Sequence, residues 1–344
     1  MNEIGIQNQS FAVELSFTGI FRKKAAKTLA EHFGTQPEYL KGAYDMWTVQ
    51  DREGKTWKLV LDRRVHGEWR VPGDFYVNKR SPIVRIRLLS PRLNYAELPK
   101  LQNCLRQLEQ AGAKVNASCD MSIHVDASNH NRQSLKNLIG IMYSKEDLIY
   151  RALQINEERA AVYSKRVREP LVEQARRLSC DETTDLTKLE EISFEGRGRP
   201  ADAINWTHNY ALNLNSVFFH NTVEWNCFNA TFQGQQIAAC LHLCLAMSAQ
   251  AIAQRSTVIK RTVSDNEQFT FRTWLVRLGL NGPEYSETRD CLLTNLTGNK
   301  ACKNTKTETK SKAEANSRTE ANVKAEEAGR RQATGRKKRR EATR

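Results

Sequence analysis

The sequence predicts an α+β protein in which helices pack on one face of a mostly antiparallel sheet. The first observation is the order of elements. Short runs in which apolar and polar residues alternate are mixed irregularly with long segments whose apolar residues have helical spacing. The second is that four strand runs each have one apolar and one polar side, as strands do when helices cover only one sheet face. We see no internal repeat that would suggest a different architecture.

The first half of the chain supplies five predicted elements. Residues 21–33 have helical spacing and are followed by Gly34 as a stop signal. Pro91 ends the later strand run. In chain order we expect a strand and turn at 10–20, a helix at 21–33, a hairpin at 46–62 around the turn 51–54, a strand at 83–91 and an amphipathic helix at 95–112.

The second half is predicted in the same way, with one stretch that has little pattern. Residues 179–207 are weakly patterned, and "EGRGRPAD" within them is typical of a loop. We expect a strand at 121–126, a helical region to about 153 and a charged helical arm to about 177, then strands at 210–219 and 222–232, helices at about 234–254 and 265–280, and a last helix before the tail.

Domain organisation is predicted from the change in composition near residue 300. We expect one domain over residues 1–300, with a helical and loop insertion at about 155–207, and a disordered basic tail at 301–344. The tail has 14 Lys and Arg against 6 Glu, so it carries +8 of the net charge of +14. It has no aromatic residue and almost no large apolar one, so it cannot bury enough surface to fold alone.

The basic tail leaves two interpretations open. The "GRKKRR" motif within 330–344 could contact a nucleic acid or an acidic partner. The alternative is a solvated tail that aids solubility, and the absence of interleaved aromatic residues argues against single-strand binding.

The N-terminal sequence and the cysteines indicate in which cellular compartment the protein is found. No basic region followed by an apolar core opens the chain, and no apolar run is long enough to span a bilayer, so we expect a cytoplasmic protein without a membrane partner. The eight cysteines include no C-x-x-C pair. Cys240 and Cys244 flank His242, but His242 points away from Cys240 on a helix, so core thiols are favoured over a metal site.

Polar residues share one side of four predicted strands. In "MSIHVD" (121–126), Ile123 and Val125 oppose Ser122, His124 and Asp126. The other polar positions are Glu14 and Ser16 in the first strand, Arg85 and Arg87 in the fourth, and Glu224 and Asn226 in the late hairpin. Such a face is either solvated and paired across strands, or it forms the floor of a site for metal and phosphate.

Six longer motifs extend over about residues 10–300. They are "FAVELSFTGIFRKKAAKTLAEHFGT", "CDMSIHVDASNHN", "MYSKEDLIYRALQ", "ALNLNSVFFHNTVEWNCFNATF", "AMSAQAIAQRS" and "FTFRTWLVRLGL". In sequence and in order, these motifs resemble the amidoligase family found in bacterial mobile elements.

The resemblance implies a fold and a reaction. The family is similar to glutamine synthetase and glutamate–cysteine ligase, whose antiparallel sheet curves around a site for ATP and divalent metal. The implied reaction joins a carboxylate to an amine. ATP first phosphorylates the carboxylate, and the amine then attacks the acyl phosphate. A polar floor suits this chemistry, because phosphoryl transfer depends on positioning and charge neutralisation.

The resemblance also assigns roles to residues on the polar face. It implies that Glu14, His124 and Glu224 are the catalytic residues and hold magnesium, whose preferred ligands include carboxylate oxygens. Asn213 matches the family motif and would orient the substrate or the nucleotide. Arg87 would contact a phosphate of ATP. The substrates would be a carboxylate and an amine, each on a small molecule or a peptide.

Four positions depart from the family pattern, and they leave two hypotheses open. Where the family carries two further carboxylates, a histidine and an arginine, this chain has Ser16, Arg87, Ser122 and Asn226. The first hypothesis is an active ATP-dependent ligase. The second is a catalytically eroded homologue that acts as a binding or regulatory protein.

Overall fold

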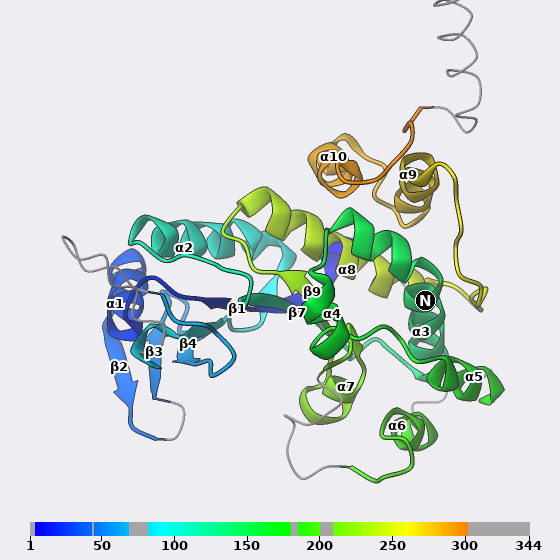
Figure 1. The fold of residues 1–344 in the computed structure, drawn as a ribbon. Helices are drawn as coiled ribbons and strands as arrows, with labels where there is room; N and C mark the ends of the chain where they lie inside the picture. The colour runs from blue at the N-terminus through cyan, green and yellow to red at the C-terminus, as the bar shows by residue number, and fades with distance from the viewer. Residues whose placement is uncertain (1–3, 43–44, 69–81, 180–184, 200–208, 302–344) are drawn as a thin grey trace, which may run out of the picture. The chain divides into compact units, whose positions relative to one another are not determined.

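The computed structural model describes residues 4–42, 45–68, 82–179, 185–199 and 209–301 (Figure 1). These residues fall into two compact units. One comprises the described residues within Met1–Val263 and Phe271–Leu296 and contains the whole sheet. The other combines Ser264–Thr270 with the described residues after Thr297, where the amide of Asn299 donates to Oδ1 of Asn266 at 3.1 Å.

The described chain contains helices and strands in irregular alternation (Figure 1). The strands are β1 (Ser10–Phe17), β2 (Pro37–Leu40), β3 (Met46–Gln50), β4 (Thr56–Leu61), β5 (Ile86–Leu89), β6 (Leu93–Asn94), β7 (Asp120–Asp126), β8 (Leu212–Asn213) and β9 (Thr222–Asn229). The α-helices are α1 (Arg22–Phe33), α2 (Leu98–Gln110), α3 (Arg132–Ala152), α4 (Glu157–Val162), α5 (Glu169–Arg177), α6 (Thr187–Ser193), α7 (Asn215–His220), α8 (Gly234–Ala253), α9 (Glu267–Arg277) and α10 (Ser286–Leu293).

The described strands form one open antiparallel sheet, which confirms the predicted fold class. The strand order is β2-β3-β4-β5-β1-β7-β9-β8, and β6 pairs with β1 outside this path. The pairings of β1 with β5 and β7, and of β7 with β9, are all antiparallel. These three pairings bring the four strands with predicted polar faces together at the centre of the sheet.

The apolar face of the sheet carries the core. Val13, Leu15 and Phe17 of β1 are buried, as the alternation predicts, and so are Leu88 of β5 and Trp225 of β9. Helices α2 and α8 lie on one side of β1 and β7, while the short helices α4 and α7 lie on the other (Figure 1). The long helices therefore seal the apolar face and leave the polar face to short elements.

Helix boundaries follow local signals in the sequence. Helix α1 ends at Gly34, whose φ of 71° is left-handed, and its amide donates to the carbonyls of Ala30 and Glu31. Helix α3 begins after Asn131, whose side chain accepts a 2.8 Å hydrogen bond from the amide of Ser134.

Helix α8 packs inside the protein. Among the described residues it is the one helix long and apolar enough to cross a membrane, but 72% of its apolar window is buried. It contacts β7, α2, α3 and α10. Cys240 and Cys244 are buried on it, and His242 is held by the Tyr95 hydroxyl at 3.0 Å and the Thr288 hydroxyl at 2.7 Å. The core interpretation of this motif is thus consistent with the structure.

Three predicted elements differ from the structure. Residues 210–219 were predicted as a strand, but only Leu212–Asn213 are extended, and α7 follows at once. The side chain of Asn213 accepts a 3.1 Å hydrogen bond from the amide of Asn215, and this local turn ends the strand. The charged arm is divided into α4 and α5, and α6 lies within the weakly patterned stretch. Residues 302–344 and parts of 179–207 lie outside the described residues.

We expect the apolar face to tolerate truncation poorly. Val13→Ala should lower the free energy of unfolding by about 2 kcal/mol, because two methyl groups are lost from a position that is 1% exposed. The matched control is Val258→Ala, since Val258 is 78% exposed and should change stability by less than about 0.5 kcal/mol. Urea denaturation of both variants measures the difference, and equal losses would contradict the assigned core.

Candidate functional site

Strand register places the predicted site residues in one row across the sheet. Ser16 of β1 lies opposite Arg87 of β5, and Glu14 lies opposite Ser122 of β7. His124 of β7 lies opposite Glu224 of β9, which in turn lies opposite Asn213 of β8. Directly opposed residues in an antiparallel pair project from the same face. The row therefore spans five strands on the side away from α2 and α8.

The guanidinium of Arg87 occupies the middle of this polar face. Its Nη1 donates to Oε2 of Glu14 at 2.9 Å, its Nε to Oδ2 of Asp62 at 2.9 Å and its Nη2 to Oδ1 of Asp120 at 2.6 Å. Arg87 is 6% exposed, so the charge-assisted hydrogen bonds to the two aspartates are buried, and the one to Glu14 is partly buried. We call Glu14, Asp62, Arg87 and Asp120 the arginine cluster.

Neighbouring groups complete the arginine cluster. The hydroxyl of Ser16 donates toward Oδ2 of Asp62 at 2.6 Å and lies 3.0 Å from Oδ1 of Asp120. Arg64 lies 3.6 Å from both aspartates, and Arg159 of α4 lies 3.5 Å from Asp120. The three carboxylates of the cluster thus face the guanidinium groups of Arg87, Arg64 and Arg159, and these charges balance once the two neighbouring arginines are included.

The second group on the polar face is centred on His124. Its Nε2 lies 3.5 Å from Oε1 of Glu14 and 3.9 Å from Oε1 of Glu224, and its Nδ1 lies 3.2 Å from the Thr222 hydroxyl. The Nδ2 of Asn213 donates to Oε2 of Glu224 at 2.7 Å. The structure therefore brings together the three residues that the resemblance assigned to catalysis and metal binding, with Asn213 beside them.

Ser122 and Asn226 bond to each other on the same face of the sheet. The hydroxyl of Ser122 donates to Oδ1 of Asn226 at 3.0 Å, and Nδ2 of Asn226 donates to the carbonyl of Tyr163 at 3.3 Å. Ser122 and Asn226 are both fully buried. Their polar atoms take part in the internal structure and are not directed into open space.

The charges shift the ionisation of these groups. Burial opposes ionisation of Glu14, but the hydrogen bond to His124 and the charge of Arg87 outweigh it and hold the pKa well below its usual range. Burial likewise opposes ionisation of Asp62 and Asp120, and the charges of Arg87 and Arg64 lower both pKa values. Burial would lower the pKa of His124, but Glu224 and Glu14 raise it.

Alternation in the sequence predicted two members of the arginine cluster and did not predict their partners. Glu14 and Arg87 were identified by alternation, whereas Asp62, Asp120 and Arg159 were not. The signal for Asp120 was present, because it has the same parity as Ser122 and His124 in β7. Arg159 comes from a short helix distant in sequence, so no periodicity could have placed it.

In the part of the chain that the structure describes, no group of three or more His, Cys, Asp or Glu side chains is arranged to hold a metal ion. Nε2 of His124 lies 3.5 Å from Glu14 and 3.9 Å from Glu224, so these three side chains form an ion-paired row.

Comparison with known proteins identifies the family. A family model described as "Putative amidoligase enzyme" matches residues 7–248, which is more than half of the chain. The chain belongs to this amidoligase family. The match covers β1 to β9 and most of α8, and so includes every residue of the polar face named above. No functionally curated protein matches the chain.

Arg87 should be a major determinant of stability in this amidoligase homologue. Arg87→Gln leaves two buried aspartates and the half-buried Glu14 without their shared cation, and we expect a loss of about 3–5 kcal/mol in the free energy of unfolding. The control is Arg92→Gln, since the side chain of Arg92 is 55% exposed and pairs with Asp126 at 3.4 Å. Chemical denaturation near pH 7 measures both, and a loss below 1 kcal/mol for Arg87→Gln would contradict the arrangement.

The raised pKa of His124 predicts a pH dependence of stability. A histidine whose folded pKa is raised stabilises the fold fully below its unfolded pKa of about 6.5, and this contribution is lost as pH rises through the folded value. His124→Gln should therefore flatten the decline in stability above pH 6.5. His66→Gln, at an exposed histidine, should leave that decline unchanged. Identical pH profiles for wild type and His124→Gln would disprove this assignment.

Proposed function

We propose that this chain is a catalytically eroded member of the amidoligase family that acts as a binding or regulatory protein. The observation that carries the proposal is the arginine cluster. Three carboxylates of the polar face, Glu14, Asp62 and Asp120, are each ion-paired with Arg87, and Arg64 and Arg159 lie against the two aspartates. An arginine side chain thus occupies the position among these carboxylates where a cation would be bound.

The described residues do not fit a magnesium ion as they stand. Magnesium requires near-octahedral oxygen coordination, usually including one or two carboxylates. A doubly charged ion about 4 Å from the Arg87 guanidinium would be repelled by roughly 8 kcal/mol at an effective dielectric of about 20. Each carboxylate of the cluster also has an oxygen within 2.9 Å of a guanidinium nitrogen. We therefore derive no step through magnesium.

The geometry also argues against Arg87 as a phosphate contact. All three of its nitrogens already donate to carboxylates, and the side chain is buried. Asn226 stands where the family pattern has an arginine, and an amide cannot supply a bidentate cationic contact to phosphate. ATP binding thus has little cationic support on this face.

Two side chains of the polar face remain partly exposed and could contact a small ligand. Glu14 has a side chain that is 22% exposed, and His124 beside it is 12% exposed, whereas Glu224 is buried. Glu14 could accept hydrogen bonds from an amine, and protonated His124 could donate one to a carboxylate. These are the two substrate groups that the resemblance implies, so binding without turnover is chemically consistent with the site.

A retained ligase activity is the second candidate, and one observation favours it. Glu14, His124 and Glu224 converge from three adjacent strands although they are far apart in sequence. In that case the chain would join a carboxylate to an amine through an ATP-derived acyl phosphate, with magnesium held by these three residues.

The proposal also includes the cellular location, the role of the basic tail and the origin of the protein. The six described cysteines are all free thiols, which is in keeping with a cytoplasmic protein. Contact of residues 330–344 with nucleic acid or an acidic partner, and an origin in a mobile element, remain proposals from the sequence.

Calorimetry with ATP distinguishes the two candidates. We expect no magnesium-dependent binding of ATP at millimolar concentration to the full-length protein, and no release of ADP in the presence of carboxylate and amine donors. Glu224→Gln should change neither result. Magnesium-dependent binding that Glu224→Gln abolishes would overturn the proposal in favour of a working ligase.

A reverse experiment tests the erosion directly. The variant Ser16→Glu, Arg87→Glu, Ser122→His, Asn226→Arg restores the family's residue types at the four altered positions. Magnesium-dependent ATP binding by this variant alone would support erosion at these positions. Because the change removes the centre of the arginine cluster, its folding is first verified by circular dichroism and by thermal melting with and without magnesium.

A further inference from the structure

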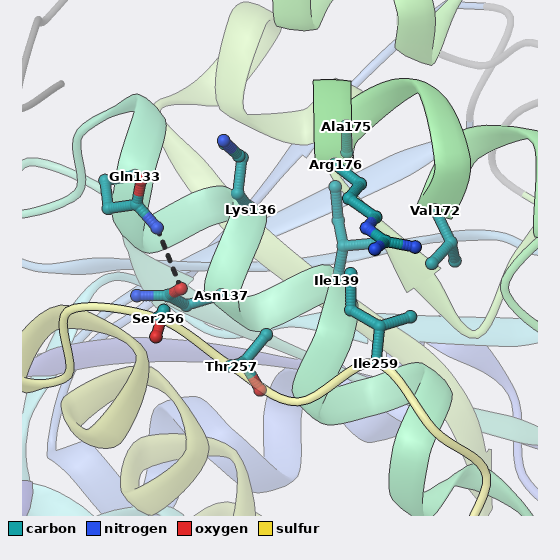
Figure 2. A pocket seen from close by; sticks show the side chains of 10 residues that line it. All are labelled: Gln133, Lys136, Asn137, Ile139, Val172, Ala175, Arg176, Ser256, Thr257 and Ile259. Carbon is teal, nitrogen blue, oxygen red and sulfur yellow. Dashed lines mark hydrogen bonds between the residues drawn. The ribbon is translucent and has the colours of Figure 1, made fainter. Parts of the chain in front are cut away.

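The segment that follows α8, residues 255–263, crosses helix α3 in extended form (Figure 2). A Cβ atom at Gly140 would lie 2.1 Å from Cγ2 of Thr257, so glycine at this position lets the segment approach α3 closely. Further along, the amide of Thr262 donates to the carbonyl of Ser144 at 3.0 Å. The segment ends where the second compact unit begins. Contacts with α3 therefore fix the path of the chain before that unit.

A fully buried carboxyl group lies beside these contacts. The side chain of Glu146 on α3 is 0% exposed. Its Oε1 accepts a 2.7 Å hydrogen bond from the amide of Val167, in the connection between α4 and α5. Its Oε2 has no hydrogen-bond partner among the described residues, and Nη1 of Arg261 lies 3.5 Å from it. Glu146 thus lies where three parts of the chain meet, with only one of its oxygens hydrogen-bonded.

The cations near Glu146 are shared with another carboxylate. Nη1 of Arg261 lies 3.4 Å from Oδ2 of Asp147, and its guanidinium lies 4.3 Å from the centre of the Tyr143 ring. Nε of Arg166 lies 3.1 Å from Oδ1 of the same aspartate. Asp147 therefore takes part of the positive charge that would otherwise stabilise an ionised Glu146.

The other titratable groups near Glu146 carry no charge that could offset its burial. They are the Tyr150 hydroxyl of α3 and the Cys227 thiol of β9. Burial raises the pKa of both groups, and the charge of Glu146 raises them further. Both groups therefore stay neutral near pH 7.

Burial dominates the ionisation of Glu146. It raises the pKa of this carboxyl to about 7, although the Val167 amide and the charges of Arg261 and Arg166 act in the opposite direction. A glutamate in water has a pKa of about 4.3. The closed arrangement therefore keeps a proton that an arrangement open to water would release. By linkage, the closed arrangement is favoured at low pH and loses stability as pH rises from about 4.3 to about 7.

We propose that Glu146 is a proton-controlled latch that holds residues 255–263 against α3. With the carboxyl protonated, the segment stays packed on the helix. When the proton leaves to solvent, the buried carboxylate is stabilised by hydration, and the segment separates from α3 more readily. This regulatory device does not rest on the proposed function of the sheet face.

Hydrogen exchange on the full-length protein tests the latch. The reporters are peptides that contain the amides of Val167 and Thr262, compared at pH 6 and pH 8 after correction for intrinsic exchange. In the wild type we expect about tenfold lower protection at pH 8, as pKa values of about 7 when closed and about 4.3 when open require. Glu146→Gln keeps an acceptor for the Val167 amide but cannot ionise, so its protection should be equal at both pH values.

The matched control is Asp147→Asn. Asp147 is the next residue, its side chain is 34% exposed, and it also pairs with Arg261. This variant should retain the loss of protection at pH 8. Arg261→Gln removes a cation that favours ionisation of Glu146, so it should move the midpoint of the loss to higher pH.

Three results would overturn the inference. They are wild-type protection that is constant or rises between pH 6 and pH 8, the same loss in Glu146→Gln as in the wild type, and a loss that disappears in Asp147→Asn. If Glu146→Gln does not fold, the direction of the midpoint shift in Arg261→Gln decides, and a shift to lower pH contradicts the latch. The outcome of the ATP experiments does not affect this test.

Discussion

The pairing of buried charge around Arg87 is the constraint on which the polar side of the sheet depends. One guanidinium joins β5 to Glu14 of β1, to Asp62 just after β4 and to Asp120 at the start of β7. A buried carboxylate without a partner is strongly destabilising, so these four positions cannot be altered independently. Ser16 fits the same arrangement, because its small hydroxyl bridges the two aspartates where a larger acid would add a fourth negative charge.

The same constraint limits what the polar face can do chemically. Electrostatic catalysis requires donors or cations that are preorganised toward the reacting group and not already neutralised. Here Arg87 is satisfied by three carboxylates, and His124 lies between Glu14 and Glu224. Ser16, Arg87, Ser122 and Asn226 are not isolated in the structure, because Ser16 and Arg87 bond to the same two aspartates and Ser122 bonds to Asn226. These polar side chains therefore stabilise the sheet from within.

The sequence predicted what depends on local periodicity. Alternation correctly gave the apolar face of β1 and the convergence of Glu14, His124 and Glu224, because side-chain direction in a strand follows from the pleat alone. It failed at residues 210–219, where the side chain of Asn213 forms a turn that competes with strand pairing. It could not supply Arg159, which reaches Asp120 only through the tertiary packing of α4.

Arg87 and Arg92 show how the setting of a residue decides its role. Arg87 is buried among three carboxylates, whereas the side chain of Arg92 is 55% exposed and lies 3.4 Å from Asp126. Water screens the exposed ion pair, so it holds its two side chains only weakly. At Arg87 an added carboxylate would have to displace an existing buried ion pair. The arginine cluster is therefore a structural part of the sheet, and an anionic ligand gains little from its cation.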